Sequence, residues 1–121
     1  MATSDLYLAS DWLRVSPLAG QAGQVGLRLD GEADMHTVEL LRRAIAELPP
    51  EADEIHICLA GLTFLDVAAA RQLVALAERP AQPRVILHSP PPVLMWLIGL
   101  LWPGSRDRFS ISPEHAARDS R

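Results

Sequence analysis

Cysteine is almost absent from this chain of 121 residues, and lysine is missing altogether. Because Cys58 is the only cysteine, an intramolecular disulfide is excluded. Cys58 stands in the most apolar segment of the chain, which predicts a small buried hydrophobe, since a reactive thiolate needs exposure and positively charged neighbours. All eleven basic residues are arginines, and we draw no functional conclusion from this bias.

Long apolar runs are also missing. The longest, residues 93–102, holds ten residues, whereas a membrane-spanning helix needs about 20. The first residues, Met1–Ser10, include acidic Asp5 but no basic residue and no apolar core of signal-peptide length. We therefore expect a cytoplasmic protein without a membrane span.

The net charge is −4 and the hydrophobic fraction is 49%. This composition is typical of a soluble globular domain. It argues against a nucleic-acid partner, because binding nucleic acid requires a basic surface that neutralises phosphates.

Motifs for metal binding and catalysis are absent as well. The four histidines, His36, His56, His88 and His115, are far apart, and no pair has the spacing of metal ligands. There is no glycine-rich phosphate loop and no G-x-S-x-G motif. We predict no catalytic residue, no metal site and no cofactor, and we expect His56 and His88, which flank predicted strands, to be structural.

The chain has the length of one domain with its own core. We expect an N-terminal segment over 1–11, a domain over 12–111 and a mobile polar tail over 112–121. Alternating apolar residues predict two strands, 12–18 and 25–29, that pair as a hairpin before Gly31 ends the second. Apolar residues three and four apart then predict a helix that Asp34 caps.

The centre of the sequence is the apolar segment 55–59. Its residues are apolar on both sides of the expected strand, which predicts a parallel strand covered by helices on each face. Gly61 is expected to end this strand, residues 62–65 to form a loop, and Asp66 to cap a helix over 67–78. A further strand over 84–88 precedes Ser89, the expected cap of a last helix.

The predicted order is β-β-α-β-α-β-α, and residues 110–112 can add a short last strand. Strands that alternate with helices pair in parallel through right-handed crossovers. We therefore predict an α/β fold in which helices pack on one mixed sheet of four to five strands.

Two segments resemble a known family. Residues 29–37, LDGEADMHT, are similar to the strand-to-helix segment of the STAS domain, and residues 59–66, LAGLTFLD, are similar to the family's hydrophobic strand that ends in F-x-D-S-S-G. STAS domains occur in bacterial anti-sigma factor antagonists and on the cytoplasmic side of sulfate transporters. The resemblance extends from about residue 12 to about residue 102, and it implies the family's fold and a protein-binding helix after Asp66.

The chain departs from the family where phosphorylation occurs. In phospho-regulated antagonists the aspartate is followed by a serine that a partner kinase phosphorylates, whereas Val67, Ala68 and Ala69 stand here. The nearest hydroxyl is that of Thr63. The resemblance thus implies a non-catalytic regulatory module, similar to an anti-sigma factor antagonist, that serine phosphorylation at the usual site does not switch.

The predicted site lies at the carboxyl edge of the sheet, where open α/β sheets usually bind their ligands. The partner that the resemblance implies is an anti-sigma factor of the serine-kinase type. The residues assigned to partner binding are Glu32, Asp34, Thr63, Asp66, Val67, Ala68 and Arg71.

Two further interpretations stay open. The last helix is apolar nearly all round, which predicts either burial or an association surface around Trp96 and Trp102, for a homodimer or for a partner. The second functional class is a small-ligand-binding sensory module, with a pocket near Asp34 and Asp66 or under the last helix.

Overall fold

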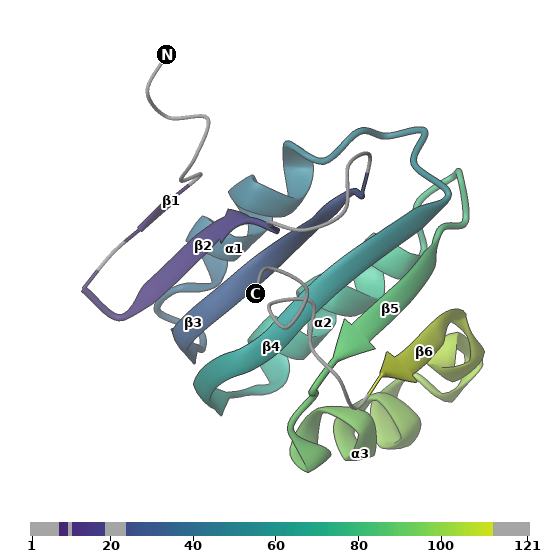
Figure 1. Ribbon diagram of the computed structural model, residues 1–121. Coiled ribbons are helices and arrows are strands. Elements are labelled where there is room, and N and C mark those ends of the chain that lie inside the picture. The colour runs from purple at the N-terminus through teal and green to yellow at the C-terminus, as the bar shows by residue number, and fades with distance from the viewer. Residues whose placement is uncertain (1–7, 10, 19–23, 113–121) are drawn as a thin grey trace.

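The structure, a computed structural model, describes residues 8–9, 11–18 and 24–112 (Figure 1). They form a mixed sheet of six strands in the order β1-β2-β3-β4-β5-β6. Strand β2 is antiparallel to β1 and β3, and the pairs from β3 to β6 are parallel. The strands are β1 (Leu8–Ala9), β2 (Leu13–Pro17), β3 (Gly26–Ala33), β4 (Glu54–Leu65), β5 (Arg84–His88) and β6 (Phe109–Ser112). The helices are α1 (Val38–Ala46), α2 (Val67–Ala77), α3 (Pro92–Leu101) and the short 3₁₀-helix η2 (Pro103–Arg108).

The predicted α/β fold and the order of its elements are confirmed. Strand β5 has the predicted bounds, and the short last strand forms as β6. One strand was not predicted: β1 has two residues and lies before the expected start of the domain at residue 12.

Helices α1 and α2 both lie behind the sheet in Figure 1, while α3 lies beyond the end of β5. The prediction that helices cover β4 on each face is therefore wrong for the described elements. Because side chains alternate along a strand, the face opposite α1 and α2 carries polar residues of β3, β4 and β5. There Arg28 Nε donates to Asp30 Oδ2 at 3.1 Å, and this hydrogen bond raises the pKa of the Arg28 guanidinium.

The core lies between the sheet and the two helices that cover one of its faces, α1 and α2. Leu27 and Leu29 of β3 and Ile57 of β4 are fully buried, as are Leu41 of α1 and Leu73 of α2. Burying a side chain of this size stabilises the fold by about 1.5–3 kcal/mol. Cys58 is buried, as the sequence predicts.

Gly31 and Gly61 do not end their strands, contrary to the prediction. Strand β4 continues to Leu65, and its pairing with β3 shifts twice: Arg28 and Asp30 pair with Cys58 and Gly61, while Gly31 and Glu32 pair with Leu62 and Phe64. Each shift places one extra residue in β4, which is the signature of a β-bulge. The segment that the sequence suggests to be a loop is therefore a bulged strand.

Ser89 does not cap α3. Each of residues 89–91 precedes a proline, and the residue before a proline is disfavoured in the helical region. The chain instead turns at Ser89, which has a φ of 56°, and α3 begins at Pro92 with Pro91 as its N-cap residue.

Replacing Gly31 with alanine should destabilise the fold. Gly31 has a φ of +109°, and a Cβ there would collide with the backbone carbonyl oxygen of Trp12. Backbone strain of this kind costs about 1–3 kcal/mol, and the collision adds to it. Gly99→Ala is the matched control, because a Cβ at that position of α3 meets nothing within 4 Å; urea denaturation should show it as stable as the wild type or more so. Equal stability of the two variants would contradict this account of Gly31.

Candidate functional site

The carboxyl ends of β3 and β4 lie side by side and lead into α1 and α2 (Figure 1). Glu32 pairs with Phe64, and Ala33 pairs with Leu65. The residues that follow these strands therefore meet at one edge, as expected for neighbouring parallel strands. We call this region the carboxyl edge and define it by residues 32–37 and 62–68, with Trp12 beside them.

Asp66 is the N-cap of α2, as predicted. Its Oδ1 accepts hydrogen bonds from the backbone N–H groups of Ala68 at 2.9 Å and Ala69 at 3.2 Å. Its Oδ2 accepts from the N–H of Met35 at 3.0 Å, a residue of the segment between β3 and α1. One carboxylate thus caps α2 and also holds the neighbouring segment. With these donors engaged, the start of α2 does not leave a cluster of free N–H groups.

Asp34 does not cap α1, contrary to the prediction. Helix α1 begins at Val38, with Thr37 as its N-cap residue. Asp34 instead accepts from the N–H of His36 at 2.8 Å and of Thr37 at 3.2 Å, which closes a turn before the helix. The Thr37 hydroxyl, in a buried residue, donates to the Glu32 carbonyl at 2.8 Å. Short polar side chains such as aspartate commonly close turns of this kind as an alternative to capping a helix.

Glu32 differs from these two aspartates. Its side chain is exposed and makes no hydrogen bond or ion pair with any residue that the structure describes. With Trp12, Asp34 and His36 it lines a cavity of about 290 Å³. The Trp12 side chain is 61% exposed. We call this cavity the acidic pocket.

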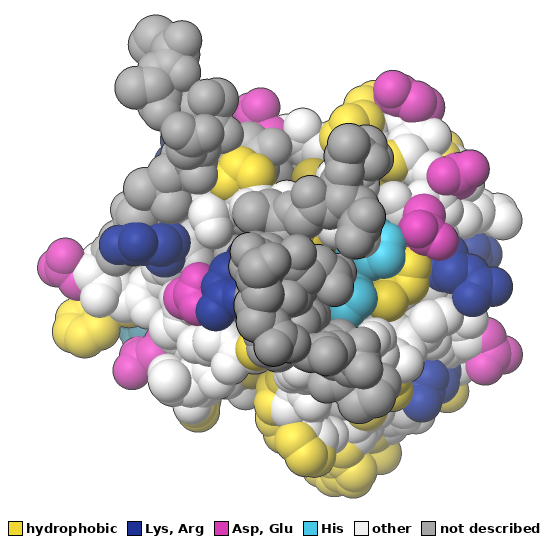
Figure 2. All heavy atoms as spheres, viewed as in Figure 1, with side chains coloured by type: hydrophobic (Ala, Val, Ile, Leu, Met, Phe, Trp, Pro, Cys, Tyr) yellow, Lys and Arg dark blue, Asp and Glu magenta, His cyan; other side chains and the backbone are white. Residues whose placement is uncertain are grey.

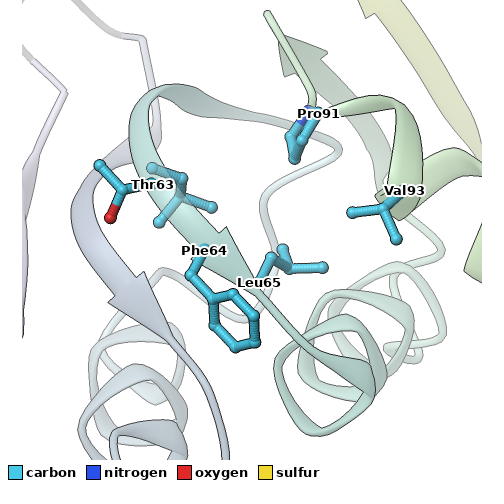
Figure 3. A pocket seen from close by; sticks show the side chains of 6 residues that line it. Thr63, Phe64, Leu65, Pro91 and Val93 are labelled. Carbon is cyan, nitrogen blue, oxygen red and sulfur yellow. The ribbon is translucent and has the colours of Figure 1, made fainter.

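A second cavity of about 270 Å³ lies between the end of β4 and the start of α3. Figure 3 shows side chains of Phe64 and Leu65 from β4, together with Pro91 and Val93 from the other wall. Phe64 is 53% exposed and Val93 is 42% exposed. We call this cavity the apolar pocket. Its lining residues are Leu62, Thr63, Phe64, Leu65, Pro91 and Val93.

Val67 opens α2 with its side chain 46% exposed. Ala68 is half-buried and Ala69 is fully buried. Thr63 is exposed, and its hydroxyl donates to the Gly31 carbonyl at 3.2 Å. The start of α2 therefore presents an apolar side chain and a small residue beside the acidic groups.

The remaining predicted residues lie farther along the helices. The Arg71 guanidinium lies over the Trp102 ring, 5.9 Å from its centroid, a cation–π arrangement. Trp102 is half-buried and packs against the core, so it differs from Trp96, which is 63% exposed. In Figure 2 hydrophobic side chains gather over α3 at the bottom of the view. The exposed members of this patch are Val93, Trp96, Leu100 and Leu101.

Two histidines meet, although the sequence suggests that all four are far apart. His56 Nδ1 and His88 Nε2 lie 2.8 Å apart and the two rings stack, because β4 and β5 pair in parallel register. Glu54 Oε1 lies 3.1 Å from His56 Nε2. His36 is at the carboxyl edge, and His115 lies outside the described residues. Within the described ranges no group of three or more His, Cys, Asp or Glu side chains could hold a metal ion.

The sequence predicted one site at the carboxyl edge, and the structure places six of its predicted residues together there: Glu32, Asp34, Thr63, Asp66, Val67 and Ala68. The prediction missed the walls of the two pockets, above all Trp12, Phe64 and Val93. The sequence analysis placed Trp12 inside the predicted strand 12–18, whereas β2 begins at Leu13, so no local signal marked Trp12 as part of the site. The positions of Phe64 and Val93 depend on the bulges of β4 and on the late start of α3.

Comparisons with known proteins bear on this site. A family model described as "Mlab, STAS domain" matches residues 18–101. The fold is similar to that of an anti-sigma factor antagonist from Mycobacterium paratuberculosis, with 24% sequence identity, a TM-score of 0.59, and coverage of 82% of this chain and 86% of that one. It is also similar to the anti-sigma factor antagonist SpoIIAA in its unphosphorylated form, with 20% identity, a TM-score of 0.55, and coverage of 83% and 90%. No curated protein matches the chain significantly. Among the described helices none is long and apolar enough to cross a membrane.

Asp66→Ala should destabilise the protein by about 2 kcal/mol, because it removes an N-cap and leaves the Met35 N–H without its acceptor. Glu32→Ala removes an equal charge from the same edge, but its carboxylate has no described partner, so stability should change by no more than about 0.5 kcal/mol. Urea denaturation of both variants measures the difference. Equal losses would show that general charge at the edge, rather than capping, accounts for the effect.

Proposed function

The chain belongs to the STAS domain family, and on that premise we propose that it is a non-catalytic regulatory module that binds a protein partner through the carboxyl edge. The partner class is an anti-sigma factor of the serine-kinase type, and the role is that of an antagonist in signal transduction to transcription. The observation that carries the proposal is the exposed apolar side chain of Val67 at the first position of α2. The positioning of this helix start by Asp66 supports it.

The same surface lacks the group that a serine kinase would phosphorylate. Val67, Ala68 and Ala69 have no hydroxyl group. The Thr63 hydroxyl, the nearest one, donates to the Gly31 carbonyl and lies in β4 rather than in the helix. We therefore infer that partner binding at this edge is constitutive, which means that a serine kinase does not switch it on or off.

The alternative function, a small-ligand-binding sensory module, has less support. Pockets for drug-sized ligands usually have volumes of about 300–1,000 Å³, and the two cavities at the edge have about 290 and 270 Å³. Exposed side chains line both cavities, which favours contact with a partner surface over enclosure of a ligand. Native mass spectrometry of the purified protein distinguishes the two functions, because a resident small ligand would add its mass.

Val67→Asp should abolish partner binding and leave the domain folded. A carboxylate at this position removes apolar contact and must give up its hydration when the partner docks, which should lower affinity at least about tenfold. In the first turn of a helix it also interacts favourably with the dipole by about 0.3–1 kcal/mol. The partner is first identified by cross-linking in source cells and then purified; calorimetric titration measures affinity and circular dichroism measures folding.

Ala75→Asp is the matched control, because it adds the same charge to an exposed position of α2 away from the carboxyl edge. It should bind the partner with wild-type affinity. Wild-type affinity of the Val67→Asp form would mean that the interaction lies elsewhere, with the exposed patch of α3 as the next surface to test.

Incubation with a serine kinase of the anti-sigma type and ATP should leave the wild-type mass unchanged between Gly61 and Arg71. Val67→Ser supplies the missing hydroxyl and should create a substrate, if the kinase recognises the rest of the edge. Intact-mass analysis followed by peptide mapping reads both results. One phosphate on the wild-type segment would refute constitutive binding.

A further inference from the structure

We propose that the partner segment that docks on the carboxyl edge carries a large apolar side chain next to a basic one, with the apolar side chain in the apolar pocket and the basic side chain at Glu32 in the acidic pocket. This inference rests on the proposed function, and it names the chemistry of the partner. The inference rests on two cavities of different character. They are neighbours because Glu32 of the acidic pocket pairs with Phe64 of the apolar pocket.

The apolar pocket accepts a side chain without polar groups. Its walls include Phe64, Leu65, Pro91 and Val93 (Figure 3), and its one side-chain hydroxyl, that of Thr63, already donates to a backbone carbonyl. A polar group placed there would lose hydrogen bonds with water and gain few in return. Phe64 and Val93 remain exposed, so burial against a partner would remove apolar surface from water.

The acidic pocket accepts a cation. The carboxylate of Glu32 has no partner among the described residues. Asp34 Oδ1, in contrast, already accepts hydrogen bonds from two backbone N–H groups in the turn before α1. The exposed Trp12 ring forms another wall. An arginine or lysine side chain that pairs with a carboxylate and lies along a tryptophan ring satisfies both features, through an ion pair and a cation–π contact.

The two pockets are neighbours. Glu32 pairs with Phe64 across β3 and β4, and the Glu32 N–H donates to the Trp12 carbonyl at 2.8 Å on the other side. Three neighbouring chain segments therefore carry one row of residues, Trp12, Glu32 and Phe64. Neighbouring strands of a sheet are about 4.8 Å apart. Two side chains of one short segment can reach both pockets, since side chains two residues apart in an extended strand are about 7 Å apart.

The test uses the full chain and the partner identified through the Val67→Asp experiment. Glu32→Arg should weaken binding at least tenfold, because the attraction between the two side chains becomes repulsion. Added salt should lower the affinity of this variant less than that of the wild type, because salt screens the repulsion as well. Phe64→Ser should also weaken binding at least tenfold. Val93→Asp provides a second variant of the apolar pocket, carried by another element, if Phe64→Ser disturbs β4. Titration calorimetry at two salt concentrations measures each affinity.

Two controls separate local contacts from general effects. Glu47→Arg makes the same charge change at an exposed position at the end of α1, and Ile111→Ser removes a comparably exposed apolar side chain from β6. Both should bind with wild-type affinity. A charge exchange completes the test: replacing the basic residue of the partner with glutamate should restore binding to the Glu32→Arg form.

The outcomes distinguish this inference from the proposed function. If Val67→Asp abolishes binding while Glu32→Arg, Phe64→Ser and Val93→Asp bind normally, the carboxyl edge is the site but the partner does not carry the paired apolar and basic side chains. Tighter binding by Glu32→Arg would indicate an acidic partner and overturn the inference in the same way. If Val67→Asp also binds normally, the proposed function itself fails.

Discussion

The carboxylate of Asp66 connects the two halves of the carboxyl edge. One oxygen accepts from the first turn of α2, and the other accepts from Met35 before α1. Charge-assisted hydrogen bonds to backbone N–H groups are among the stronger ones in proteins. Because both sets of donors bind one carboxylate, it ties the start of α2 to the segment after β3. This link keeps the backbone near the exposed residues Glu32 and Val67 together at the carboxyl edge.

The bulges of β4 give this edge its second feature. In a regular strand, residues 60 to 65 would alternate without interruption between the two faces of the sheet. Because there are two extra residues, the alternation is restored at the end of β4: Leu65 points into the core at 6% exposure, as Ile57 does earlier in the strand, while Phe64 stands beside Glu32 on the open face. A bulge commonly re-aims a side chain near a functional site. In β4 the two bulges advance the pairing by two residues, so that Phe64 rather than Leu62 lies opposite Glu32.

The sequence predicted what depends on local patterns and missed what depends on register. Helix α2 and its cap follow from Asp66 and from the spacing of buried residues such as Leu73, and β5 follows from a short apolar run; both were predicted. Glycine was interpreted as a strand end at Gly31 and Gly61, whereas in each case the absence of a Cβ permits close packing inside the sheet. Nothing local in the sequence reveals that requirement, because the colliding atoms belong to other segments of the sheet region, Trp12 just before β2 and Asp30 of β3. The same holds for the covering of β4 by helices on one face only, and for the contact of His56 with His88, because both depend on how whole elements pack and pair.

The size and character of the two pockets bear on the kind of recognition that they support. On the proposed mode of docking, each pocket holds roughly one side chain of the partner. The contact then provides two anchors rather than a large continuous area, and area is a poor measure of affinity. The apolar pocket supplies free energy by removing surface from water, but it discriminates little among apolar side chains of similar size. The carboxylate of Glu32 discriminates by charge, because a partner with an acid at that position suffers repulsion. Affinity and specificity thus reside in adjacent residues of two paired strands. On the proposed mode of docking, a substitution in either pocket changes how tightly a partner binds, and reversal of the charge at Glu32 also changes which partners bind.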